Sequence, residues 1–186
     1  MDKLELAKWA SDYALKKGAS QAAVNVSNSR SVQIDVRDKK IETLKETTEN
    51  NLSIYIYLDH KYSGHFSNDL RKESIQRMID EAIAATKYLS ADDFRELPDP
   101  LHYPTGKPQN LDLVDTNYED LTTEKRIKLA KEVENSAVAM SDQIISAQGS
   151  FSDSIYSSAK VLSNGFEGST AGTRFGISSA VTVRDN

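Results

Sequence analysis

Apolar and polar residues alternate through the stretch from Ser31 to Asn68, in short runs that are separated by turn residues. In residues 32–37 and again in residues 52–58, every even position is valine, isoleucine or leucine, and every odd position is polar or tyrosine. Successive side chains of a strand point to opposite faces, so this period of two predicts half-buried antiparallel strands. Turns are expected at Asp38-Lys39 and at Asp59-His60-Lys61. The resulting meander has one apolar face that needs a cover.

Helical spacing predicts three helices, over about Asp2–Lys17, from a cap at Asn68 or Asp69 to Leu89, and over about Leu121–Met140. Their apolar stripes are, in chain order, Leu6, Ala7, Ala10 and Ala14, then Ile75, Met78, Ile79, Ala82, Ile83 and Thr86, then Ile127, Ala130, Val133, Ala137 and Met140. Burying each large apolar side chain contributes roughly 1.5–3 kcal/mol. The stripe of the second helix is therefore the expected cover for the apolar face of the meander.

Further strands are predicted over Gln21–Ser27, Ile144–Phe151, Ser154–Leu162 and Phe175–Val183, with a turn at Ser163-Asn164-Gly165. The order helix, strand, hairpin strands thus occurs twice, although the two halves share little residue identity. The expected fold class is α+β, an antiparallel β meander covered by helices, with this order of elements occurring twice.

All four prolines lie between Pro98 and Pro108. Proline removes a donor and biases the residue before it away from helix, so this stretch is expected to be an extended connection. The predicted division is an N-terminal α+β domain at 1–97, a Pro-rich and acidic linker at 98–120, and a second, middle α+β domain at 121–186. The second domain lacks the last strand and covering helix of the first, which indicates truncation and the front part of a longer protein. The alternative is a complete domain that ends on an edge strand.

Composition is that of an ordinary soluble protein, with 38% hydrophobic and 27% charged residues and a mean hydropathy of −0.54. No apolar run approaches the roughly 20 residues of a membrane helix, and the N-terminus lacks the apolar core of a secretory signal. The chain has no cysteine, which excludes disulfides and thiolate metal sites and fits a cytoplasmic location. A net charge of −5 argues against nucleic acid as the main partner.

The candidate metal ligands are poorly arranged. His60 and His65 are expected in a turn and on a strand, His102 lies far away in sequence, and neither HExxH nor HExxxH is present. Two acidic groups lack the loop spacing of a calcium site and are expected to be solvated linker residues. They are Asp92, Asp93, Glu96 and Asp99, and Asp112, Asp115, Glu119 and Asp120.

Other motifs also favour structure over chemistry. The glycine-rich stretch Gly165–Gly176 lacks the Lys-Ser/Thr ending of a phosphate-binding loop, so its glycines are expected to serve tight hairpins and close sheet packing. The serines of SFSDSIYSS have no neighbouring histidine, and the basic residues of the third helix alternate with acidic ones on an expected exposed face. Three interpretations explain Tyr55 and Tyr57 equally well: they line a peptide path, pack in a core, or are exposed on the surface. No catalytic, metal-ligating or substrate-binding residue is therefore assigned.

Several phrases, together spanning most of the chain, resemble the TldD/PmbA family, whose members were first named modulators of DNA gyrase. They are LKKGASQAAVNVS, the meander SVQIDVRDKKIETLKETTENNLSIYIYLDHKYSGHFSND, the helix and proline exit LRKESIQRMIDEAIAATKYLSADDFRELPDP, and SNGFEGSTAGTRFGISSAVTVRDN. The last is more similar to the PmbA/TldE-like branch, which lacks HExxxH. Asp38-Lys39 and His60-Lys61 stand where the family commonly has glycine.

The resemblance implies a TldD/TldE-type metalloprotease assembly that digests unfolded or small peptides through an enclosed tunnel and matures peptide antibiotics. It implies an N-terminal α+β region that helps to form a dimer and the peptide path. Zinc is implied only for the catalytic domain or partner subunit, and no cofactor for this chain. The expected partner is an identical chain or a TldD-like subunit.

The expected function is therefore the N-terminal, non-catalytic portion of a PmbA/TldE-like subunit in cytoplasmic peptide proteolysis or maturation. A stand-alone module that binds extended peptides without cutting them is the alternative. Gyrase-linked nucleic-acid binding rests on the old family name, and the acidic balance argues against it.

Overall fold

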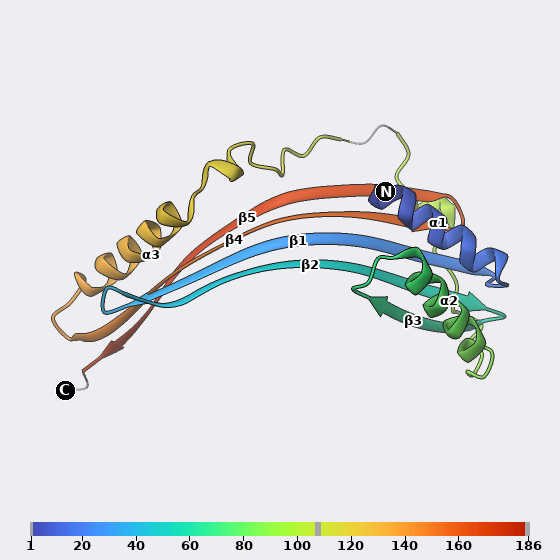
Figure 1. Ribbon diagram of the computed structural model, residues 1–186, viewed down its shortest axis with the longest axis horizontal. Helices are drawn as coiled ribbons and strands as arrows, with labels where there is room; N and C mark the ends of the chain where they lie inside the picture. Colours follow the sequence, from blue (N-terminus) through green and yellow to red (C-terminus); the bar gives the residue numbers. More distant parts are fainter. Residues whose placement is uncertain (1, 107–108, 185–186) are drawn as a thin grey trace. The chain divides into compact units, whose positions relative to one another are not determined.

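The computed structural model describes residues 2–106 and 109–184. One five-stranded sheet in the order β3-β2-β1-β4-β5 is combined with three α-helices, which confirms the expected α+β class (Figure 1). The elements, in chain order, are α1 (Lys3–Lys16), β1 (Gln21–Arg37), β2 (Lys40–Leu58), β3 (Lys61–Ser67), α2 (Lys72–Thr86), the 3-10 helices η1 (Pro100–His102) and η2 (Tyr118–Asp120), α3 (Thr123–Val138), β4 (Ile144–Leu162) and β5 (Phe166–Val183).

Two compact units divide the chain, and each is assembled from three segments. Unit 1 comprises residues 1–28, 49–111 and 157–170, and unit 2 comprises residues 29–48, 112–156 and 171–186. Because strands β1, β2, β4 and β5 are long, each of them contributes residues to both units. The sequential division at residues 97 and 120 stays a prediction, and Lys107, Pro108 and residues 185–186 lie outside the described residues.

The turns predicted at Asp38-Lys39 and after β2 are both confirmed, the second as the two residues Asp59 and His60, because Lys61 already begins β3. Asp38 and Lys39 have φ angles of 49° and 61°, and Asp59 and His60 have φ angles of 50° and 62°. Two successive residues with positive φ match the right-handed twist of the flanking strands, and aspartate tolerates this region better than most residues do. Both hairpins therefore form without glycine in their turns.

The strands are longer than the sequence predicts. The expected strand Gln21–Ser27 and the run at 32–37 are parts of one continuous β1, and the two strands expected between Ile144 and Leu162 are one β4. β5 begins at Phe166, not at Phe175. Polar residues that suggested breaks lie within these strands, because the ladder satisfies their backbone groups. The side chains of Asn28 and Ser152 reach solvent, whereas that of Asp153 is buried.

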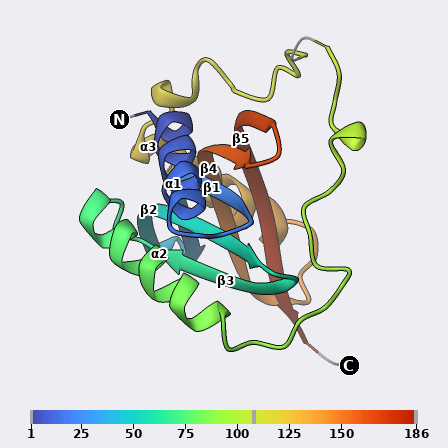
Figure 2. The same cartoon turned by 90° about the vertical axis from the view of Figure 1, so that its right-hand side faces the viewer.

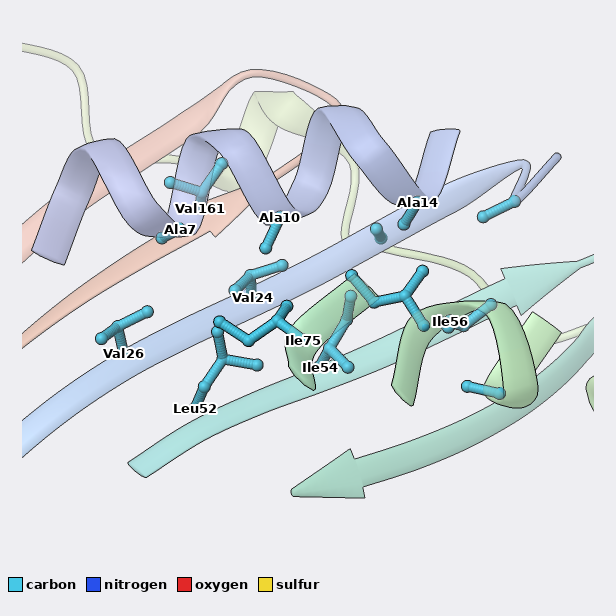
Figure 3. Packing of buried hydrophobic residues seen from close by; sticks show 14 of the residues in the cluster. Ala7, Ala10, Ala14, Val24, Val26, Leu52, Ile54, Ile56, Ile75 and Val161 are labelled. Carbon is cyan, nitrogen blue, oxygen red and sulfur yellow. The ribbon is translucent and has the colours of Figure 1, made fainter. Parts of the chain in front are cut away.

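The core of unit 1 lies between strands and the helices α1 and α2 (Figures 2 and 3). Leu52, Ile54 and Ile56 of β2 are fully buried, as are Ile75 and Ile79 of α2. In this unit the predicted cover of the meander by the second helix is confirmed. Ala7, Ala10 and Ala14 carry α1 onto the same core, and their small side chains let that helix approach β1 closely.

The predicted cap of α2 is wrong by a few residues. The helix begins at Lys72 after Arg71, which makes no side-chain capping bond. The Asp69 carboxylate instead accepts hydrogen bonds from the Arg71 backbone N–H at 3.0 Å and from the Ser74 hydroxyl at 2.7 Å. These bonds form a turn before the helix, since short acidic side chains readily bind backbone N–H groups two residues ahead.

Unit 2 has its own core, and this corrects three expectations. Val32, Ile34 and Val36 of β1 are covered by α3 and by Phe151, not by the second helix. The buried face of α3 includes Arg126 and Glu134, which the sequence placed on an exposed face. Met140, expected in the apolar stripe, follows the end of the helix and is 82% exposed.

None of the described helices is long and apolar enough to cross a membrane.

The Ile54→Ala substitution should lower the free energy of unfolding by about 2–5 kcal/mol, because it leaves a cavity beneath α2. Urea unfolding followed by circular dichroism measures this loss. Leu89→Ala is the control, since Leu89 is exposed and its truncation should change the free energy by less than about 0.5 kcal/mol. Equal effects of the two substitutions would contradict the assigned core.

Candidate functional site

The three histidines are placed on different elements. His60 lies in the turn between β2 and β3, His65 lies on β3, and His102 ends η1. Among residues 2–106 and 109–184, no three histidine, aspartate or glutamate side chains gather closely enough to hold a metal ion. The acidic residues of both linker groups are exposed.

His65 takes part in a short hydrogen-bond chain in unit 1. Thr86 donates its hydroxyl proton to the Ala82 carbonyl at 2.7 Å, so its oxygen accepts from Ser63 at 2.5 Å. The Ser63 oxygen then accepts from His65 Nε2 at 3.0 Å. Burial lowers the pKa of His65. Because His65 donates in this arrangement, it does not serve as a base for the Ser63 hydroxyl.

A cluster of four aromatic side chains, here called the aromatic face, lies on β2 and β3 of unit 1. It consists of Tyr55, Tyr57, Tyr62 and Phe66. Tyr55 and Tyr57 alternate with the buried core residues of β2, so they point to the side of the sheet opposite that core. The antiparallel register sets Tyr57 opposite Tyr62 and Tyr55 opposite Gly64.

The rings of the aromatic face are in mutual contact. Tyr55 stacks on Tyr62 with ring centroids 5.8 Å apart and an interplanar angle of 8°, and Phe66 meets Tyr55 edge-on at 6.2 Å. Tyr57 and Tyr62 are 5.2 Å apart. Such pairs contribute roughly 0.5–1.5 kcal/mol beyond area burial. The rings therefore hold one another in place, although Phe66 remains 64% exposed.

Gly64 makes this stacking possible. A Cβ atom at this position would lie 2.9 Å from the Tyr55 ring, which is closer than real Cβ contacts. The ring consequently lies over the β3 backbone, where any other residue would displace it. Gly64 is thus required by the packing of the Tyr55 ring.

The electrostatics of the aromatic face are close to neutral. Burial raises the pKa of Tyr57 and of Tyr62, so both hydroxyls stay protonated at physiological pH. The Arg95 guanidinium lies 5.2 Å from the centre of the Tyr62 ring. Beside Tyr57 is a cavity of about 360 Å³, lined by Ser20, Gln21, Tyr57, Asp59, His60, Arg95 and Glu96.

Unit 2 contains a buried charge pair that the sequence did not reveal. Arg126 on α3 donates from Nε to Asp153 Oδ2 on β4 at 2.5 Å and from Nη2 to Asp153 Oδ1 at 3.2 Å. Tyr118 donates its hydroxyl to Asp153 Oδ1 at 2.5 Å, and Arg126 Nη1 donates to the Leu121 carbonyl. Arg126 and Asp153 are both buried, so bonds from several directions compensate their lost hydration.

The buried network shifts the pKa values of its own side chains. Burial, and then the hydrogen bond to Asp153, raises the pKa of Tyr118 to about 12. The bond to Asp153 raises the pKa of Arg126. Tyr118 also lines a cavity of about 570 Å³ together with Asp115, Asn117, Asp120, Leu121, Lys125, Leu129, Phe151 and Phe175. Its ring lies 5.9 Å from that of Phe175.

One signal of the buried pair was present in the sequence. One face of α3 carries, at helical spacing, Arg126, Ala130, Glu134 and Ala137. Because the alanines between the charged residues are small, this face can approach another element closely. Gly149 confirms that closeness, since a Cβ there would lie 2.2 Å from the Ala130 carbonyl oxygen. Glu134 reaches the first hairpin, where its carboxylate accepts from the Lys39 N–H at 3.0 Å.

The glycine-rich stretch has the expected structural role. Gly165 has a φ of 114° in the turn before β5, and a Cβ at Gly172 would lie 2.6 Å from the Tyr156 hydroxyl oxygen. Both observations confirm glycines that serve a hairpin and close sheet packing.

The Asp153→Asn substitution should destabilise the chain by about 3–5 kcal/mol, because it leaves the Arg126 charge buried with a neutral partner. Glu46→Gln is the matched control, since Glu46 pairs with Arg30 at 2.7 Å on the surface and should hardly change the urea midpoint. Similar midpoints for both variants would show that the buried pair is not needed for stability.

Alkaline titration tests the environment of Tyr118. Its folded pKa of about 12 exceeds its unfolded value, so the stability it contributes is present below pH 10 and falls between about pH 10 and 12. We expect the tyrosinate absorbance that appears last on raising the pH to be absent in Tyr118→Phe. Tyr88→Phe, at an exposed position, should instead remove absorbance that appears early. Loss of an early component in Tyr118→Phe would contradict the buried network.

Comparison with known protein families gives two matches. The model described as PmbA/TldA metallopeptidase domain 1 matches residues 22–86, and the model described as PmbA/TldA metallopeptidase central domain matches residues 116–186. Together they account for most of the chain.

Curated relatives agree with these matches. The chain is 28% identical over 175 residues to the metalloprotease PmbA homolog of Haemophilus influenzae, a match covering 93% of this chain and 38% of that protein. It is 26% identical over 175 residues to metalloprotease PmbA of Escherichia coli O157:H7, covering 92% and 38% respectively. The chain therefore spans 38% of the length of these relatives.

Among solved structures, a protein from Bacteroides thetaiotaomicron described as a modulator of DNA gyrase superposes with a TM-score of 0.91 at 34% identity. That match covers 97% of this chain and 41% of the other. TldE from Thermococcus kodakarensis superposes with a TM-score of 0.69 at 18% identity, covering 97% and 39%, and shows the shared fold.

Proposed function

Because this chain belongs to the PmbA/TldD metallopeptidase family, we propose that it is the non-catalytic, peptide-handling portion of a PmbA/TldE-type subunit. The observation that carries the proposal is the succession of the family's domain 1 and central domain along one chain. The work proposed for the complete assembly is cytoplasmic proteolysis or maturation of peptides. A location in the cytoplasm agrees with the absence of cysteine from the sequence.

The donor groups of residues 2–106 and 109–184 do not fit a zinc site. Zinc in proteins takes three or four closely placed nitrogen, sulfur or carboxylate ligands, and the described histidines and carboxylates form no such group. We assign the zinc chemistry of the family to another domain or to a partner subunit. The role left to this chain is to bind and orient the peptide.

The aromatic face is the surface we propose for peptide contact. Its rings are fixed by mutual stacking, so little side-chain entropy is lost when a ligand covers them. Neutral tyrosine hydroxyls add hydrogen-bonding groups without favouring one charge of peptide. Such a surface suits unfolded peptides of varied sequence.

Phe66→Ala should weaken binding of fluorescein-labelled casein about five-fold or more, because an aromatic anchor contributes about 1 kcal/mol or more to such a contact. Fluorescence anisotropy measures this affinity. Tyr88→Ala is the control, since Tyr88 is 90% exposed, lies after α2 and is not part of the aromatic face. If both variants bind casein as the unmodified chain does, the aromatic face is not the peptide surface.

A partner surface is proposed on β5 of unit 2. This strand is at the edge of the sheet, and Phe175, Ile177, Val181 and Val183 are all exposed along it. Long apolar edge strands are normally protected from association. We propose that this strand joins a second subunit, either an identical chain or a TldD-like one.

Ile177→Lys should weaken that association about ten-fold or more, since it places a charge in an apolar contact. Sedimentation of the chain alone and mixed with a TldD-like subunit measures it. Ser178→Lys, on the neighbouring residue of the same strand, is the control for added charge. A chain that sediments as a monomer in both experiments would refute the proposed partner surface.

The second candidate is a stand-alone module that binds extended peptide without any catalytic partner. It is favoured by the presence of two strands, β3 and β5, at the edges of the sheet. Addition of a TldD-like subunit distinguishes the two functions. Cleavage of bound casein that depends on both chains supports the subunit, whereas binding with no effect of this chain on cleavage supports the module.

A further inference from the structure

Residues 92–103, here called the covering segment, run beside the aromatic face within unit 1. The segment contains no regular structure before η1, and its residues from 92 to 102 are exposed with the exception of Leu97. Its first residue is held at the β2–β3 turn, because the Asp92 N–H donates to the His60 carbonyl at 2.8 Å. Exposed connecting segments of this kind are normally more mobile than the helices and strands that they connect.

Leu97 is the apolar anchor of the covering segment. It is 5% exposed and forms a buried cluster with Ala23 and Leu162, against which the partly buried rings of Tyr55 and Tyr57 pack. These neighbours belong to β1, β2 and β4, so the side chain packs on the surface of the sheet. Peptides that bind to proteins in an extended conformation are often anchored in the same way, by one buried aliphatic side chain on an otherwise exposed backbone.

Polar groups complete the contact on both sides of Leu97. The Leu97 N–H donates to Gln21 Oε1 at 2.8 Å, and Arg95 lies over the Tyr62 ring. After the anchor, the Pro98 carbonyl accepts from the Asn164 amide at 2.9 Å. The contacts therefore use one backbone N–H, one backbone carbonyl, a cation and an aliphatic side chain.

We propose that Arg95–Pro98 is an internal ligand, and that the surface beneath it is a docking site for extended peptides of the same chemistry. The site takes a peptide with a cationic side chain two residues before an aliphatic side chain. The aliphatic side chain packs on Ala23 and Leu162, while the cation lies on Tyr62. The proposal rests on the proposed function in taking peptide as the external ligand, and it adds specificity and regulation to it.

Tethering gives the covering segment an effective concentration of about millimolar. An external peptide therefore binds only in the fraction of molecules whose segment has detached, and its apparent affinity falls by that fraction. The segment is suited to detach, because a few separate contacts fix it to the strands and their turns. The exposed ion pair between Arg95 and Asp92 joins two residues of the segment itself and adds no contact to the sheet.

The probe is a synthetic peptide with the sequence of residues 92–100, DDFRELPDP, labelled for fluorescence anisotropy. Leu97→Ser in the protein should detach the internal ligand and tighten binding of this peptide ten-fold or more. Leu101→Ser is the matched control, since Leu101 is in the same segment but 83% exposed, and should leave the affinity unchanged. Peptides with serine for the leucine, or glutamate for the arginine, should bind at least ten-fold more weakly to the Leu97→Ser variant.

Equal affinities of the unmodified chain, Leu97→Ser and Leu101→Ser for the peptide would overturn the proposal. Hydrogen exchange in the unmodified chain gives a test that does not depend on a folded variant. Saturating peptide should accelerate exchange of the Leu97 amide, and an amide that stays equally protected would also overturn the proposal.

These experiments distinguish failure of the internal ligand from failure of the aromatic face as the peptide surface. If Phe66→Ala weakens casein binding while Leu97→Ser has no effect on the probe, peptide handling stands and the internal ligand is wrong. If the probe binds the Leu97→Ser variant as expected while Phe66→Ala leaves the affinity for casein unchanged, the docking site stands and the broad peptide surface is wrong.

Discussion

The register between β2 and β3 is the constraint on which the features of unit 1 depend. With Tyr57 opposite Tyr62, one side of β2 presents Leu52, Ile54 and Ile56 to the helices, and the other presents the aromatic face. A slip of one residue would exchange these two sets, because side chains alternate along a strand. The helices α1 and α2 stabilise the register by burying the aliphatic set, and so they also fix where the tyrosines stand.

Unit 2 uses a different stabilising principle. Its small apolar core around Ile34 and Phe151 is supplemented by the buried pair of Arg126 and Asp153. Such a pair contributes little net stability over apolar residues of the same size, but its loss on one side is costly. It also requires α3, η2 and β4 to meet in one arrangement, because Tyr118 and the Leu121 carbonyl must reach the same two side chains.

Patterns of period two and of helical period, together with turn residues, were sufficient to predict the three helices, the three hairpin turns and the core residues of β2, because these depend on local sequence. The lengths of β1 and β4 were not predictable from local polarity, since half-exposed polar residues such as Asn28 occur within a long ladder. The covering of Val32–Val36 by α3 and the burial of Arg126 depend on tertiary partners far away in sequence. Tyr55 and Tyr57 were noticed, yet their grouping with Phe66 and Leu97 required the register and the path of the covering segment.

The central claim is that peptide is bound on the aromatic face of unit 1, and photo-crosslinking tests it most directly. An unfolded peptide that carries benzoylphenylalanine is irradiated with the protein, and the crosslinked residues are mapped by mass spectrometry. The account predicts crosslinks at Tyr55, Tyr62 and Phe66. Crosslinks confined to the helices α1 and α2, or to unit 2, would contradict it.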